Sequence, residues 1–208
     1  MFDAATLASF IAIVIGLFLI PGPAVMLILS RTIQGGRKAG ILAGLGTACG
    51  DFVHTIFAAV GLSALLMTSA LAFSIVKYAG AAYLIYLGVR AFLEKAQAPS
   101  PTETPRLPRG TAFSQAILAE ILNPKTALFF LAFMPQFVHP GKGPVIVQFT
   151  ILGMIFSGLS AVYSTLLVLS MGFLGRALKR ATFLRRWQGK IVGSILIMLG
   201  LRVAMQAR

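Results

Sequence analysis

The sequence is poor in charged residues, and in acidic ones above all. Only 11% of its 208 residues are charged, and 5 acidic residues stand against 18 lysines and arginines, a formal net charge of +13. A soluble domain usually carries about 25% charged residues. With 58% hydrophobic residues, most of the surface is expected to face lipid. The basic residues lie between hydrophobic runs, which indicates a topology signal and not nucleic-acid binding.

Cysteine and histidine are also scarce. Cys49 is the single cysteine, so the chain cannot form an internal disulfide or a C-x-x-C redox pair. The two histidines are His54, in an apolar run, and His139, in a Pro/Gly loop. No nucleophile–base pair and no cluster of metal ligands is evident at the predicted membrane surface. We therefore predict neither an enzyme nor a cofactor.

Long hydrophobic runs are abundant, and six of them reach the about 20 residues that cross a membrane. They are residues 5–30, 39–67, 71–93, 112–138, 145–174 and 190–205. The first lacks a basic start and exceeds the about 7–15 apolar residues of a signal peptide, so we expect it to be retained. The alternation of β-barrel strands is absent. The predicted fold class is an all-α membrane protein with about six transmembrane helices.

A proline-rich polar stretch at residues 96–110 predicts a linker between two units of three helices, residues 1–95 and 111–208. Most basic residues lie after the first, third and fifth helices, and Arg31 is counted in the first of these loops. The positive-inside rule then predicts cytoplasmic loops and both termini outside. The membrane is expected to be the cytoplasmic (inner) membrane of a bacterial cell.

The two units resemble each other. The shared features are Lys77-x-x-Gly80 with Lys190-x-x-Gly193, and Phe10 with Phe113, each eleven residues before a proline. Because each unit has an odd number of helices, the second unit is upside down relative to the first. The pattern predicts inverted repeats, an architecture typical of transporters. Chance similarity between apolar helices is the alternative.

Both predicted repeats contain a helix break, at Pro21-Gly22-Pro23 and at Asn123-Pro124-Lys125. Proline lacks an N–H donor and glycine adds freedom, whereas Asn followed by Pro favours a helix start. Each break therefore predicts a half-helix whose free N–H groups and positive dipole end could bind a carboxylate. We predict that these residues bind the substrate. A structural kink is the alternative, since membrane helices tolerate proline.

Asp51 lies about 12 residues into the second predicted helix, or ~18 Å at 1.5 Å per residue, close to the bilayer midplane. A charge there costs at least ~2.5 kcal/mol and is usually functional. Asp51 is predicted to hold a substrate ammonium, to carry a coupling proton, or both; a structural carboxyl is the alternative. His54, on the same helix face, and Glu120 are further candidates for proton coupling. Glu120 could instead cap the second break or pair with Lys125.

Glycines recur at a spacing of four, which lets helices approach closely. The candidates for helix packing are Gly36, Gly40, Gly44, Gly46, Gly50, Gly80, Gly189 and Gly193. Gly50, beside Asp51, could also leave room for a substrate.

Several of these motifs together resemble the lysine exporter (LysE) superfamily. They are Pro21-Gly22-Pro23, Gly36-Arg37-Lys38-Ala39-Gly40, Asp51, Lys77-x-x-Gly80-x-x-Tyr83-Leu84, and Asn123-Pro124-Lys125 followed by Leu128-Phe129-Phe130. The chain resembles in particular the homoserine/threonine resistance (RhtB) exporters. The resemblance implies export of amino acids or their derivatives from the cytoplasm, driven by proton movement.

We therefore predict a secondary transporter in a lipid membrane that exports amino acids, by proton antiport or by facilitated efflux. The hydrophobic fraction is compatible with a monomer or a homodimer. The alternative function is export of a divalent metal ion bound by Asp51, His54 and Cys49. A membrane enzyme and a non-transporting scaffold are less well supported by these motifs.

Overall fold

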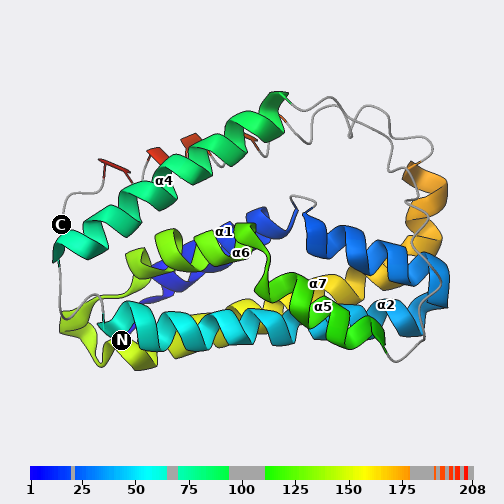
Figure 1. The fold of residues 1–208 in the computed structure, drawn as a ribbon, viewed down its shortest axis with the longest axis horizontal. Helices are drawn as coiled ribbons and strands as arrows, with labels where there is room; N and C mark the ends of the chain where they lie inside the picture. Colours follow the sequence, from blue (N-terminus) through cyan, green and yellow to red (C-terminus); the bar gives the residue numbers. More distant parts are fainter. Residues whose placement is uncertain are drawn as a thin grey trace.

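The structure is a computed structural model that describes residues 1–19, 22–64, 70–93 and 111–178. In the C-terminal stretch it describes residues 190, 193–194, 197–198, 200–201 and 204–205. Every regular element in these ranges is a helix (Figure 1). The elements are α1 (Ala4–Phe18), α2 (Pro23–Phe57), η1 (Ala58–Leu62), α4 (Ala70–Leu93), α5 (Thr111–Ile121), α6 (Pro124–Leu128), η2 (Phe129–Phe133), η3 (Met134–Phe137), η4 (Pro140–Lys142) and α7 (Val145–Leu178). The predicted linker at residues 96–110 lies outside the described residues.

Helix α2 consists of two arms that fold back on each other at Gly36. Gly36 has φ 74° and ψ −175°, a left-handed conformation that glycine adopts at little cost. Figure 1 shows the blue first arm running to one end of the molecule and the lighter second arm returning. A Cβ at Gly40 would meet the Thr32 side chain of the first arm. The expectation that Gly36 is a packing glycine is therefore wrong, because Gly36 makes the turn.

The helices agree with five of the six predicted segments. By length and composition, Pro23–Leu62 and Val145–Met171 can each cross a membrane. The pair Thr111–Ile121 and Pro124–Phe137, bent by 44°, passes the same test as a pair and is either a broken span or a re-entrant loop. Because Gly36 reverses the chain, α1 with the first arm of α2 forms the first predicted segment and the second arm forms the next. Helix α4 forms the third predicted segment. The sixth is described only in part, and the inverted repeat stays a prediction.

Small residues bring the second arm of α2 close to α5 and α7. A Cβ at Gly44 would lie 2.6 Å from Ser164 Oγ of α7, and one at Gly46 would lie 2.9 Å from Ala116 Cβ of α5. Gly50 faces Glu120, whose Cβ would be 2.6 Å away. The expected room for a substrate at Gly50 is therefore taken by α5.

Two further candidate glycines concern α4 and the C-terminal stretch. Gly80 lies within α4. A Cβ at Gly193 would lie 2.5 Å from the carbonyl oxygen of Gly88 in α4, and one at Gly200 would lie 2.8 Å from that of Ala81. As the chain proceeds from Gly193 to Gly200, its contacts move backwards along α4, so the two segments are antiparallel.

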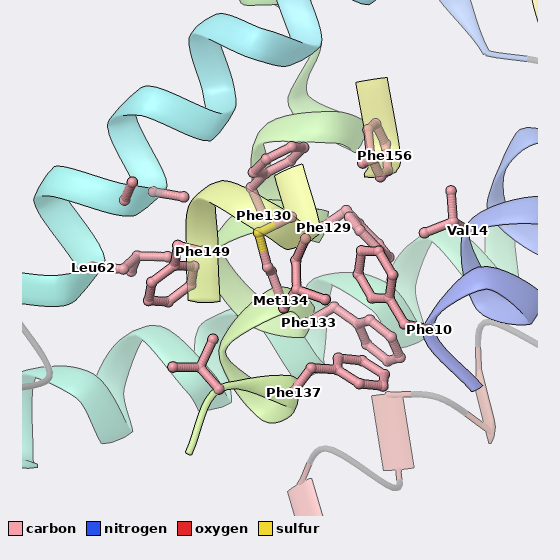
Figure 2. Close-up of a cluster of buried hydrophobic side chains, with 14 of the residues drawn as sticks. Phe10, Val14, Leu62, Phe129, Phe130, Phe133, Met134, Phe137, Phe149 and Phe156 are labelled. Carbon is pink, nitrogen blue, oxygen red and sulfur yellow. The ribbon is translucent and has the colours of Figure 1, made fainter. Parts of the chain in front are cut away.

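A cluster of phenylalanines forms the largest buried apolar region (Figure 2). Its rings are Phe10 of α1, Phe129, Phe130, Phe133 and Phe137 of η2 and η3, and Phe149 and Phe156 of α7. The Phe10 and Phe137 ring centroids are 5.2 Å apart, and those of Phe130 and Phe156 are 5.0 Å apart, within the range of favourable aromatic pairs. This aromatic cluster joins α1 to η2, η3 and α7 on the N-terminal side of the first break.

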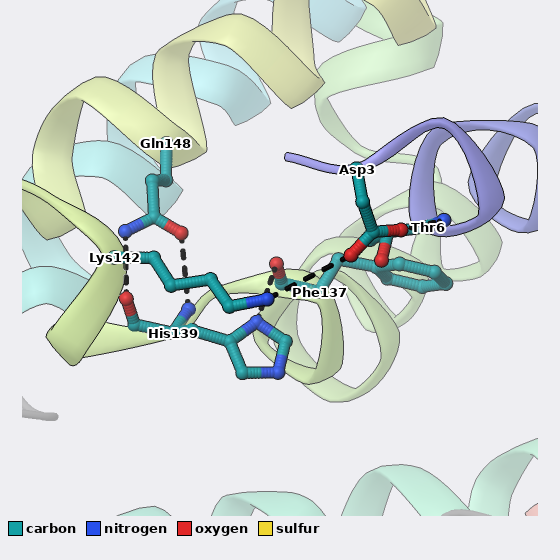
Figure 3. A network of polar contacts seen from close by, with 6 residues as sticks. All are labelled: Asp3, Thr6, Phe137, His139, Lys142 and Gln148. Carbon is teal, nitrogen blue, oxygen red and sulfur yellow. Dashed lines mark hydrogen bonds and ion pairs between the residues drawn. The ribbon is translucent and has the colours of Figure 1, made fainter. Parts of the chain in front are cut away.

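Beyond the aromatic cluster, the loop between η3 and α7 is held by Gln148 (Figure 3). Gln148 is fully buried; its Oε1 accepts from His139 N at 3.0 Å, and its Nε2 donates to the carbonyls of His139 and Gly143, both at 2.9 Å. On the exposed side, Lys142 Nζ lies 3.7 Å from Asp3 Oδ2. Asp3 is the N-cap of α1 and accepts a hydrogen bond from the Thr6 N–H. This hydrogen bond and the charge of Lys142 hold the pKa of Asp3 below its usual value. These contacts tie the start of the chain to the loop before α7.

The α2–α5 contact predicts a stability test. Gly46→Ala should lower the free energy of unfolding by about 1–3 kcal/mol, because the added methyl group meets the Phe113 carbonyl and Ala116. Gly158→Ala is the matched control, since nothing lies within 4 Å of a Cβ there; alanine should stabilise that helix by up to about 1 kcal/mol. Thermal unfolding in detergent compares the two variants. Equal shifts would show that the α2–α5 contact is not tightly packed.

Candidate functional site

Both predicted half-helix starts are confirmed. Gly22 is the extended N-cap of α2, with no side-chain cap and Pro23 at the first helical position. Asn123 is the N-cap of α6, its Oδ1 accepting from Lys125 N at 3.1 Å, with Pro124 in the first position. Pro21 lies outside the described residues. The two starts differ, because Asn123 satisfies an amide of α6 whereas Gly22 leaves the first amides of α2 without a cap.

Lys125 links the two breaks. Its Nζ donates to the carbonyl oxygen of Leu17 at 2.8 Å, close to the end of α1, where helical carbonyls lack intrahelical partners. A Cβ at Gly22 would lie 3.4 Å from Lys125 Cδ and 3.6 Å from its Nζ. The lysine side chain therefore lies across the first break, although it starts at the second.

Glu120 organises the second break. It is 2% exposed, and its carboxylate oxygens accept from Asn123 Nδ2 at 3.2 Å and from Thr126 Oγ1. Its backbone carbonyl accepts from His54 Nε2 at 2.9 Å; because a carbonyl can only accept, His54 carries a proton on Nε2. These hydrogen bonds agree with the capping alternative for Glu120.

Asp51 is the most completely buried acid in the described part of the chain, at 1% exposed. Its carboxyl group interacts with Ser160 of α7 and with Glu120. Its Oδ2 has no hydrogen-bond partner among the described residues. A buried carboxylate oxygen is costly without a donor, so Oδ2 can accept a proton or an ammonium group.

These groups surround one cavity of about 40 Å³. Its polar lining comprises Gly22, Thr47, Asp51, Glu120, Asn123, Lys125, Thr126, Ser160, Tyr163 and Ser164. Its apolar lining comprises Leu17, Phe18, Ala24, Val25 and Ile28. Pockets for organic ligands usually measure about 300–1,000 Å³, and one water needs about 10–15 Å³. The site therefore has room for a few waters and not for a whole amino acid.

The cavity gathers most, but not all, of the predicted residues. Gly22, Asp51, Glu120, Asn123 and Lys125 line it, whereas Pro23, Pro124 and His54 are absent from the lining. The His54 ring lies against Phe130, with centroids 5.6 Å apart. His54 therefore does not line the cavity itself, but it is hydrogen-bonded to the backbone carbonyl of the cavity residue Glu120.

Sequence reasoning missed the hydroxyl groups of the site, above all those of α7. Ser160 and Ser164 both line the cavity, and their spacing of four places them on one helix face. The spacing of the two serines is the signal for this polar face in the sequence. Charged residues do not mark it, because the apolar run of α7 contains none.

The prediction that Arg31 belongs to a basic loop is wrong. Arg31 lies in the first arm of α2, and its side chain is only 7% exposed. Its guanidinium donates to Gln115 of α5. The predicted first loop therefore begins at the Gly36 turn and not at Arg31.

The ligands expected for the metal alternative do not converge. In the part of the chain that the structure describes, no group of three His, Cys, Asp or Glu side chains could hold a metal ion. Cys49 is exposed, whereas Asp51 and His54 are buried. The geometry does not favour metal export.

Comparison with known proteins finds relatives along most of the chain. The chain matches the LysE type translocator family over residues 15–207. It is 35% identical to the uncharacterized membrane protein YrhP of Bacillus subtilis, over 96% of this chain and 99% of that protein. It is 32% identical to the uncharacterized membrane protein PA4757 of Pseudomonas aeruginosa, over 92% and 91%. It is 30% identical to the leucine efflux protein of Salmonella typhimurium, over 89% and 88%.

No solved structure matches the chain. The family match covers most of the chain, and relatives above 30% identity span it almost from end to end. The protein is therefore an integral membrane transporter and not an enzyme, and it belongs to the LysE family of translocators.

Proposed function

We propose that this protein is a secondary transporter that exports amino acids from the cytoplasm. The observation that carries the proposal is the cavity, whose lining includes Lys125 and Asp51. Among the described residues, Asp51 Oδ2 has no hydrogen-bond partner. An amino acid is a zwitterion and needs partners of both signs. The similarity to a leucine efflux protein supports an amino acid with an apolar side chain as the first substrate to test.

The substrate carboxylate would bind at the start of α2. The first amides of this helix are uncapped, because Gly22 supplies no side chain and the first backbone hydrogen bond of the helix runs from Met26 N to the Gly22 carbonyl. Lys125 is the adjacent cation. The start of α6 contributes less than the sequence predicts, because Asn123 already accepts from its first free amide.

The substrate ammonium would bind Asp51. A proton and an ammonium compete for the same carboxylate, so proton entry from outside would release the amino acid. Glu120 interacts with Asp51, and the backbone carbonyl of Glu120 accepts from His54. Glu120 and His54 are therefore candidates to move that proton. Rocking of one unit against the other would expose the cavity to each side in turn. The basic loops would face the cytoplasm, and both termini the outside of an inner membrane.

Asp51→Asn tests the coupling step. The substitution keeps the shape of the side chain but removes its charge and its proton-binding oxygen. Leucine efflux driven by a pH gradient should fall at least about tenfold, the effect of losing one charge-assisted hydrogen bond. The measurement is efflux of labelled leucine from loaded vesicles, with and without the gradient. Asp3→Asn, at an exposed helix cap, is the matched control and should behave as the wild type. Unchanged gradient-driven efflux in Asp51→Asn would refute the role of Asp51.

Lys125→Met tests the carboxylate site. Methionine keeps the length of the side chain but cannot attract a carboxylate or donate to the Leu17 carbonyl. The KM for leucine should rise about tenfold. Lys142→Met removes an exposed cation and should leave KM unchanged. Concentration-dependent efflux from vesicles measures both variants. A normal KM in Lys125→Met would mean that Lys125 only holds the helix break together.

A further inference from the structure

A second buried cation lies outside the cavity. Arg31 Nη2 donates to Gln115 Oε1, and its Nη1 donates to Gln34 Oε1 at 3.4 Å. Its Nε is buried without a partner among the described residues. Both of its hydrogen-bond partners in the described ranges are therefore neutral amides, although the side chain is only 7% exposed.

An arginine whose hydrogen-bond partners are neutral amides lacks the carboxylate that would complete an ion pair. The guanidinium stays charged in proteins, and its planar donors match the two oxygens of a carboxylate. A buried charge is costly unless it is paired, and a carboxylate is a stronger partner than an amide. Arg31 can therefore exchange Gln115 for a carboxylate with a gain in interaction.

The Arg31–Gln115 bond lies just beyond one end of the cavity. Arg31 follows the cavity residue Ile28 by three residues, about 4.5 Å along α2, and Gln115 precedes Glu120 by five, about 7.5 Å along α5. Both displacements point away from the aromatic cluster. They point towards the Gly36 turn and the start of α5, the side that the basic loops predict to be cytoplasmic. At this level the apolar packing is small and consists of Ile28, Ala43, Ala116 and Val168.

We propose that Arg31 is a carboxylate-binding residue at the inner entrance of the transport site. Gln115 occupies the guanidinium while the entrance is closed. The carboxylate of an arriving amino acid displaces Gln115, which breaks a link between the two units and opens the way to the cavity. The proposal rests on amino-acid export and adds to it a requirement: the substrate has a free carboxylate at entry as well as in the cavity.

Variants of Gln115 separate this role from a structural one, because they shift KM in opposite directions. Gln115→Glu gives Arg31 a permanent carboxylate partner, so the KM for leucine should rise about tenfold. Gln115→Ala removes the competing amide and should lower KM. A purely structural link would be weakened by the alanine and strengthened by the glutamate, with KM unchanged in both. The assay is initial efflux of labelled leucine against internal concentration in vesicles.

Variants of Arg31 complete the test. Arg31→Gln should raise the KM for leucine about tenfold, and Arg31→Lys should lie between it and the wild type. Leucinamide, which lacks the carboxylate, should compete with leucine more strongly in Arg31→Gln than in the wild type, relative to the affinity for leucine. Arg37→Gln, at an exposed site beside the turn, is the control of equal charge and should keep the wild-type KM.

The outcomes are distinguishable. A wild-type KM in Arg31→Gln, or parallel KM changes in the two Gln115 variants, overturns the role of Arg31 and leaves amino-acid export standing. If the wild type exports neither leucine nor any other amino acid of a broad panel, the proposed function falls, and the role of Arg31 falls with it.

Discussion

The broken backbone inside the membrane is the constraint on which the site depends. Lipid offers no hydrogen bonds, so irregular backbone is tolerated at membrane depth only where protein groups or water satisfy it. Here the second break supplies the group that the first one needs, since Lys125 donates to the Leu17 carbonyl. Asn123 caps its own helix and is itself held by Glu120. The two breaks are therefore stable as a pair, and the cavity forms between them.

The contacts of α1 and α2 with α5 and the helices that follow it differ at the two ends of that cavity. On one side the aromatic cluster packs Phe10 against rings of η2 and η3. On the other side the apolar packing is smaller, and a partly buried hydrogen bond joins Arg31 to Gln115. Apolar burial is proportional to area and has no exchangeable partner, whereas a hydrogen bond can be exchanged for a better one. The end with the arginine is thus the one that an anion can open.

The sequence predicts local features well and distant partners poorly. The helix breaks and the cap at Asn123 follow from residue type and spacing, and the structure has helix starts at both breaks. The sequence predicts Arg31 to be a loop cation, because its partner Gln115 is 84 positions away. Gln115 is uncharged, so no charge pairing in the sequence indicates the contact. Gly36 has the spacing of a packing glycine, but its positive φ is a property of the turn. In both cases the sequence does not indicate the three-dimensional surroundings of the residue.

The same contacts explain why a zwitterion suits the cavity better than a simple ion. The cavity contains the ammonium group of Lys125, which donates to the Leu17 carbonyl, and two carboxyl groups. The Glu120 carboxylate is hydrogen-bonded to Asn123, whereas Asp51 Oδ2 has no partner among the described residues. A lone cation or anion would add net charge to a buried site, which is costly. In the proposed mechanism an amino acid brings one charge of each sign, so its carboxylate can replace the Leu17 carbonyl at Lys125 while its ammonium replaces a proton at Asp51. The amino acid itself brings no net charge into the site, so the charge of the site changes on binding only by the proton that Asp51 releases, which is the step that would couple export to proton movement.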